Sequence, residues 1–176
     1  MTLRPVPWLA VPVLTSAFFS LALGCGAPFA AIAALGALVL GRRDAYLAAF
    51  FAWVANQAVG FGFLGYPTDP RTLAWGVAIG LSALAAVWSA RWIAALLAGA
   101  SWPAICIAAL AAALIAQQVT ILASAQVLGF HPAAFAPAVL FDIAWTNAAA
   151  FVLLVAVQMG GAQVNLTRAP GQSVPA

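Results

Sequence analysis

Residues 103–125 read PAICIAALAAALIAQQVTILASA, a run that contains no charged side chain. A bilayer core of roughly 30 Å is crossed by about 20 helical residues, because each residue of an α-helix advances the chain by about 1.5 Å. This run is therefore long enough to cross a membrane as a single helix. It predicts an all-α integral membrane protein.

The composition of the whole chain leads to the same class of protein. Of its 176 residues, 66% are hydrophobic and 5% are charged. A soluble domain carries about 25% charged residues, so this chain has too few to cover a surface that faces water. The low charge also excludes nucleic-acid binding through a basic patch.

The inventory of reactive side chains argues against an enzyme. The chain has one histidine, three acidic residues and no lysine, and it lacks a GxxxxGK[ST] phosphate-binding loop. General acid–base chemistry needs more groups of this kind than the chain provides. We therefore expect no enzymatic activity, and we expect any nucleotide hydrolysis to come from partner subunits.

Breaks at arginine, proline and glycine residues divide the chain into six apolar segments. They cover residues 7–23, 27–41, 45–65, 72–90, 103–125 and 137–159. We expect them to form one transmembrane domain over residues 1–162, a compact bundle of about six helices in a bacterial inner membrane. Residues 163–176 are expected to form a flexible cytoplasmic tail.

The first two segments allow more than one arrangement, because residues 7–41 form a single charge-free stretch interrupted by Gly24-Cys25-Gly26-Ala27-Pro28. Two glycines and a proline favour a turn there. With that turn and six crossings, five arginines share one side and only Arg71 lies on the other. The positive-inside rule then places both termini in the cytoplasm. Two full crossings and a re-entrant hairpin remain alternatives.

Polar residues within the third segment form the sharpest local pattern. Trp53, Asn56, Gln57 and Gly60 stand at offsets 0, 3, 4 and 7, which places them on one face of a helix. They are candidates to bind a ligand. The alternative is that the two amides only hold neighbouring helices together, which small residues such as Gly60 would allow to approach closely.

The fifth and sixth segments add further candidates for ligand binding. Gln117 and Gln118 are hard to place against lipid, so at least one should face the bundle interior or a wet cavity. Asp142 is the only carboxylate within an expected span, and Trp145 and Asn147 follow it. A carboxylate near the start of a helix is also favoured by the helix dipole alone, so Asp142 has a structural interpretation as well.

Cys25 and His131 both fall in loops that the expected topology places on the outer face. Two such residues do not complete a zinc site. A single thiolate or imidazole could still contact a metal that a cofactor holds, such as the cobalt of a corrinoid. The alternatives are a buried thiol at a turn and a histidine at the membrane interface.

The six segments, the prolines of the outer loops and the opening of the last segment, Pro137-Ala-Val-Leu-Phe-Asp142-Ile-Ala-Trp145-Thr-Asn147, resemble one known family. They are similar to the substrate-binding (S) subunits of energy-coupling factor vitamin transporters. The resemblance implies a ligand pocket near the outer face, built from the later helices and the outer loops. It also implies a transmembrane coupling subunit and ATPases as partners. Some solitary members handle cobalamin, which Cys25 and His131 would suit.

Two functions are therefore expected from the sequence. The first is uptake of a small molecule, a vitamin or cofactor precursor and conceivably a cobalamin, bound in a cavity between the third, fifth and sixth segments. The second is a non-transporting accessory or assembly protein, in which the same polar groups pair only with neighbouring helices. A cavity shared by these residues would favour uptake.

Overall fold

The computed structural model describes residues 14–19, 21, 27–129 and 132–163, and every regular element in this part of the chain is helical. The elements are α2 (Phe29–Val39), α3 (Arg42–Gly62), α4 (Pro70–Leu96), α5 (Trp102–Leu128), the 3-10 turn η1 (Pro132–Phe135) and α6 (Pro137–Gln163). Residues 14–19 and 21 are helical as well. The predicted all-α class is therefore confirmed for the described residues.

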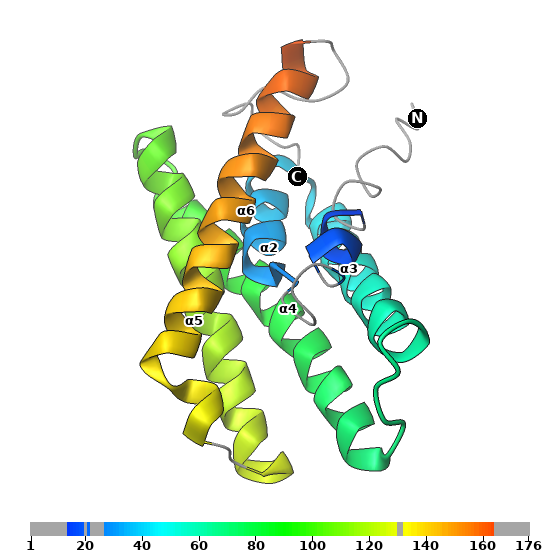
Figure 1. Ribbon diagram of the computed structural model, residues 1–176. Helices are drawn as coiled ribbons and strands as arrows, with labels where there is room; N and C mark the ends of the chain where they lie inside the picture. Colours follow the sequence, from blue (N-terminus) through cyan, green and yellow to red (C-terminus); the bar gives the residue numbers. More distant parts are fainter. Residues whose placement is uncertain (1–13, 20, 22–26, 130–131, 164–176) are drawn as a thin grey trace.

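Three helices are long and apolar enough to cross a membrane, by length and composition. They are α4, α5 and the Pro137–Gly160 part of α6. Figure 1 shows that α3, α4, α5 and α6 alternate in direction, so that the α3–α4 and α5–α6 connections lie at one end of the bundle. We call this end the η1 end. The expected six crossings remain a prediction. The side of the membrane on which each end of the bundle lies also remains a prediction.

α3 is not among these three helices, although its 21 residues would be long enough. Its first turn is charged, because it begins Arg42-Arg43-Asp44, and two amides, Asn56 and Gln57, lower the hydropathy of its second half. The middle of α3 is tied to the preceding chain, since the Ser16 hydroxyl donates a hydrogen bond of 2.7 Å to the carbonyl of Ala52.

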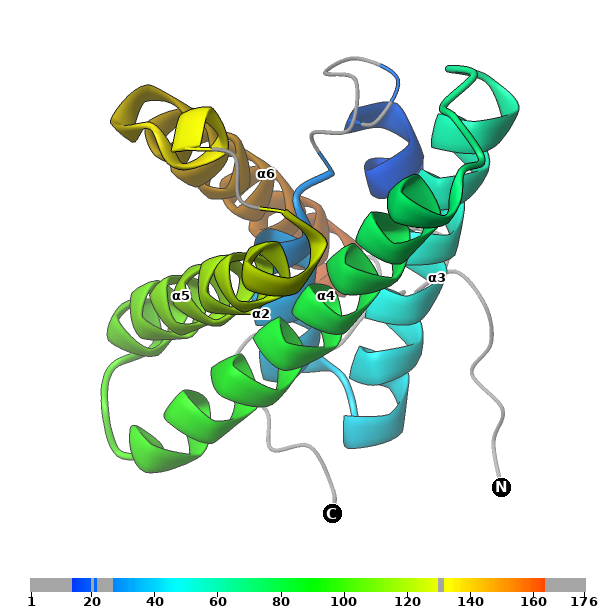
Figure 2. The same cartoon turned by 90° about the horizontal axis from the view of Figure 1, so that it is seen from below.

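α2 lies at the centre of the bundle, where α3, α4, α5 and α6 all contact it (Figure 2). All its residues from Phe29 to Ala37 are buried. With 11 residues it is about 16 Å long at 1.5 Å per residue, about half of a bilayer core. The segment expected over residues 27–41 thus contains a buried helix that is too short to cross a membrane by itself.

Alanine dominates the surfaces through which the helices meet α2. Fully buried alanines lie on α2, α4 and α5 at Ala30, Ala33, Ala34, Ala83, Ala86, Ala90, Ala109 and Ala113. Small side chains allow backbones to approach closely, which strengthens van der Waals contact where lipid removes the usual hydrophobic driving force between helices. This alanine core positions α2 and sets the places at which the larger polar side chains can reach it.

Candidate functional site

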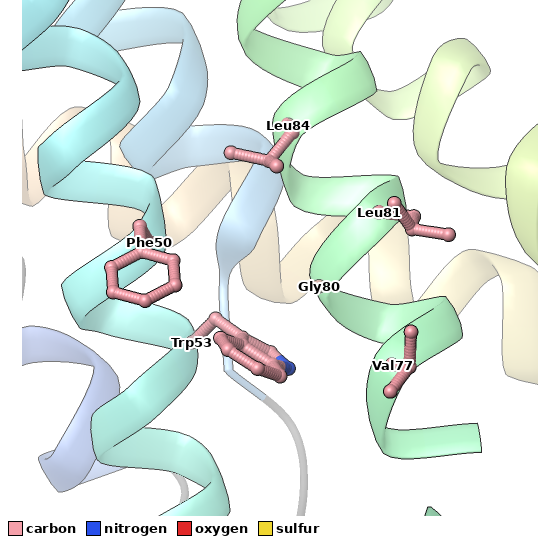
Figure 3. Close-up of a pocket in the computed structure, with 6 residues that line it drawn as sticks. All are labelled: Phe50, Trp53, Val77, Gly80, Leu81 and Leu84. Atoms are coloured by element: carbon pink, nitrogen blue, oxygen red, sulfur yellow. The ribbon is translucent and has the colours of Figure 1, made fainter. Parts of the chain in front are cut away.

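The Trp53 indole reaches from α3 to α4, where its Nε1 donates a hydrogen bond of 2.8 Å to the carbonyl of Gly76 (Figure 3). The ring lies against Gly80, at which a Cβ atom would stand 2.8 Å from Cε2 of the indole. Phe50, Val77, Leu81 and Leu84 complete an apolar groove of about 120 Å³ around it. The polar edge of Trp53 is thus used between helices, and only apolar surface lines the groove.

Gln57 joins Trp53 on the face of α3 that meets α4. Its Oε1 would stand 2.5 Å from a Cβ atom at Gly76, so this glycine makes room for the amide. Asn56 is buried, with 6% of its surface exposed, and is engaged in an interaction. Trp53 and Gln57 therefore pack against Gly76 and Gly80 of α4. This is a contact between helices, the alternative to ligand binding that the sequence analysis considered for these side chains.

Asn147 holds the N-terminus of the central helix. Its Oδ1 accepts a hydrogen bond of 3.0 Å from the backbone N–H of Ala31, and its Nδ2 donates one of 2.9 Å to the carbonyl of Ile143. The first N–H groups of a helix have no partner within the helix, and Pro28 at the N-cap offers no side-chain cap. Asn147 therefore acts as the cap that the sequence around Pro28 lacks.

Arg91 holds the opposite end of the same helix. Its Nη1 lies 3.3 Å from the carbonyl oxygen of Leu40 and 3.5 Å from that of Ala37, and it donates to both. A cation beside the last carbonyls of a helix is favoured by the helix dipole. One residue of α6 and one of α4 thus supply the two caps of α2.

Asp142 and Trp145 lie on an exposed face of α6. Trp145 has 66% of its surface exposed, and Asp142 is exposed as well. α6 is 27 residues, about 40 Å, long, so a helix centred in a 30 Å core extends about 5 Å beyond each face. Asp142 lies about 7 Å along the helix from Pro137. It therefore stands close to the interface, where a carboxylate and an indole are both tolerated.

Gln117 and Gln118 are both half-buried on α5. The Oε1 atom of Gln117 is buried and has no hydrogen-bond partner among the described residues. The neighbouring hydroxyls of Thr120 and Ser124 donate to carbonyls of their own helix, at 2.8 Å each. Among the described residues, Gln117 is therefore the one predicted site residue with a buried side-chain oxygen that lacks a hydrogen-bond partner.

The predicted site residues do not converge on one cavity in the described structure. Trp53 and Gln57 contact α4, Asn147 contacts α2, and Asp142 lies on an exposed face. Cys25 and His131 lie outside the described residues. Within the residues that the structure describes, no group of three or more histidine, cysteine or acidic residues could hold a metal ion.

A different pocket lies at the η1 end. It has a volume of about 260 Å³ and is lined by Trp75 of α4, Ile121, Ala125 and Gly129 from α5 and its C-cap, and Ala134 and Phe135 of η1. We call it the η1 pocket. None of the eight residues predicted to bind a ligand lines it. Its walls are ordinary apolar residues, which sequence reasoning passes over because the chain contains so many of them.

Arg71 lies beside this pocket in the first turn of α4. Asp69 caps that turn, accepting hydrogen bonds from the backbone N–H groups of Arg71 and Thr72 and from the Thr72 hydroxyl. The hydrogen bonds from Thr72 hold the pKa of the exposed Asp69 carboxyl below its ordinary value. The sequence analysis used Arg71 only to assign topology, as the one arginine expected on its side of the membrane.

The chain was also compared with known proteins. No family model, curated protein or solved structure matches it.

Proposed function

We propose that this chain is a membrane-embedded subunit for uptake of a small molecule, and that it binds its ligand in the η1 pocket. The pocket itself carries the proposal: a hollow of about 260 Å³ lies between two long apolar helices and a short connection at one end of the bundle. Binding pockets are typically concave and mostly apolar, with a few polar groups. The transporter resemblance supports the same location, since it implies a site built from later helices and outer loops.

The volume limits the size of the ligand. An engineered protein cavity of about 150 Å³ binds benzene, so a pocket of 260 Å³ has room for about ten non-hydrogen atoms. A corrinoid ring with its side chains is several times larger. The proposed ligand is therefore a small vitamin-like molecule or cofactor precursor, and cobalamin is no longer part of the proposal.

The remaining parts of the proposal concern how the subunit is placed and driven. The arginine distribution supports both termini in the cytoplasm of a bacterial cell and the η1 end outside, whether residues 7–41 form two of six crossings or a re-entrant hairpin. The scarcity of acid–base residues supports a subunit that is not an enzyme. Energy would then come from a transmembrane coupling subunit and ATPases.

The test is whether the chain retains a small molecule in this pocket. Protein extracted from its host membrane in mild detergent is purified, and small molecules released on denaturation are identified by mass spectrometry. Ala134→Trp fills the pocket from η1, whereas Ala133→Trp adds the same bulk one residue away, outside the lining. We expect retention by the native chain and by Ala133→Trp, and loss from Ala134→Trp. Equal retention by both variants, or none by the native chain, contradicts the proposal.

A second candidate is a non-transporting accessory or assembly protein. The observation that favours it is the use of predicted site residues as contacts between helices, with Trp53 bonded to α4 and Asn147 bonded to α2. On this alternative the same experiment finds nothing in the η1 pocket. Replacement of either residue then lowers the thermal stability of the protein without changing any ligand.

A further inference from the structure

The η1 pocket has a cation at its edge. The Arg71 guanidinium lies against Gly129, where the position of a Cβ atom would overlap it. Gly129 has a φ of +107°, a conformation that residues with a Cβ rarely adopt. Glycine therefore both ends α5 and makes the space into which the guanidinium fits. Gly129 also lines the pocket, so the exposed Arg71, which is not itself a lining residue, stands next to the pocket wall.

This guanidinium has no carboxylate partner within the described part of the chain. Asp69, the acidic residue nearest in sequence, directs its oxygens to the backbone N–H groups that begin α4 and to the Thr72 hydroxyl. Asp44 lies in the first turn of α3, at the opposite end of the bundle from the η1 end. Asp142 lies nearer, on an exposed face of α6 close to the η1 end, but no ion pair joins it to Arg71 among the described residues. A guanidinium beside an apolar pocket and without an acidic partner is complementary to an anion.

The residues that line the pocket determine which chemical groups the body of the ligand can carry. Trp75 stands one helical turn after Arg71, so the two side chains share a face of α4. Ile121 and Phe135 add further apolar surface, and among the described lining residues the indole N–H of Trp75 is the one side-chain hydrogen-bond group. A ligand body with several hydroxyls or amides would lose its water there and find at most this one new partner. Sugars and nucleosides are therefore poor fits.

We infer that the η1 pocket binds a small organic monoanion, with an aromatic or branched aliphatic body of about ten non-hydrogen atoms whose carboxylate pairs with Arg71. Arginine suits this role because its planar fork of N–H donors matches a carboxylate with two parallel hydrogen bonds. The inference rests on the proposed function and names its ligand class. The anion is a free solute and not the headgroup of a membrane lipid.

The experiment compares two probes of equal size, 4-methylbenzoate and the neutral 4-methylbenzamide. Binding to the full chain is measured by titration calorimetry at pH 7 in phosphatidylcholine nanodiscs, with the signal of empty nanodiscs subtracted. Arg71→Gln removes the charge at the pocket. Arg42→Gln is the matched control, because Arg42 is exposed at the other end of the bundle.

We expect the native chain and Arg42→Gln to bind the benzoate at least about tenfold more tightly than the amide, a difference of about 1.4 kcal/mol. Arg71→Gln should reduce this preference to less than about twofold and leave the affinity for the amide unchanged, which also shows that the variant still folds. Equal binding of the two probes overturns the inference and leaves the proposed function standing. Failure of both probes to bind overturns it as well, while the proposed function is judged separately by the retained molecule.

A repeat in phosphatidylglycerol nanodiscs distinguishes the two sources of an anion. A preference that persists there supports a free anion in the pocket. A preference that phosphatidylglycerol abolishes assigns Arg71 to lipid headgroups and overturns the inference.

Discussion

Replacing Asn147 by leucine tests whether this residue holds the central helix rather than a ligand. Leucine has the same branching and the same number of side-chain heavy atoms as asparagine, so it removes the hydrogen-bond acceptor without leaving a cavity. The N–H of Ala31 then loses its 3.0 Å bond at the buried start of α2. The adjacent Thr146→Ala is the matched control, because it changes the same turn of α6 and leaves this bond intact.

The expected loss follows from two measured ranges. Removing a side-chain cap costs about 0.5–2 kcal/mol, and leaving a buried donor without a partner costs about 1–3 kcal/mol. These ranges describe the same lost bond and are not added, so we expect a loss of about 2 kcal/mol. For a chain of this size each kcal/mol moves the melting temperature by about 2–4 °C, which gives a decrease of about 4–8 °C.

Two measurements check this expectation in detergent-solubilised protein. Thermal unfolding should show the decrease for Asn147→Leu and a shift of less than about 2 °C for Thr146→Ala. Hydrogen exchange should accelerate at the first turn of α2 in Asn147→Leu alone, because local opening no longer breaks a bond to α6. Unchanged exchange in α2, together with a melting temperature equal to that of the control, would refute the role of Asn147 as a cap.

Contacts between helices lead to three further expectations, each checked by thermal unfolding. Gly80→Ala places a Cβ atom 2.8 Å from the Trp53 ring and should cost about 1–3 kcal/mol, most of which Trp53→Phe in the same chain should restore. Arg91→Gln should lower stability by about 1 kcal/mol, because the last carbonyls of α2 lose a charged donor; a variant as stable as the native chain would contradict this. Gln117→Leu should leave stability unchanged or raise it, since the buried Oε1 has no partner among the described residues; a loss above about 1 kcal/mol would reveal one.

The long helices are predictable because their signal is local. The segments expected over 72–90, 103–125 and 137–159 correspond to helices over 70–96, 102–128 and 137–163. Each begins beside a proline, which is favoured in the first turn of a helix, and each then runs through apolar residues without interruption. The observed helices are longer than the expected segments because charged and polar residues near the interface continue the helix beyond the apolar run.

The central helix could be predicted only in part. The turn expected at residues 24–28 lies for the most part outside the described residues, and the burial of every residue from Phe29 to Ala37 could not be read from the sequence. An alanine-rich helix that is apolar on all sides has no amphipathic pattern, so its sequence does not predict which face is buried. Whether it crosses the membrane or lies within the bundle depends on four neighbours that are distant in sequence.

The candidate site residues chosen from the sequence and the residues that line the η1 pocket are of different kinds. Polar side chains in apolar segments such as Trp53 and Asn147 stood out, yet the structure uses them between helices. The η1 pocket is lined by common apolar residues, and Arg71 was considered only as a marker of topology. A pocket of this kind is formed by tertiary contacts, so the spacing of residues along the chain does not predict it.

The short central helix explains why two polar groups are placed so deep in this bundle. A helix that starts and ends inside a bilayer buries N–H groups at one end and carbonyl groups at the other, and lipid offers them no partner. Neither end of α2 is capped by a side chain of its own sequence, since Pro28 and Leu40 flank it. Neighbouring helices must then provide an acceptor at the start and a donor at the end, and Asn147 and Arg91 do so. Part of the polarity that first suggests a binding site thus follows from a short helix that begins and ends within the bundle, whereas Arg71 caps no end of α2.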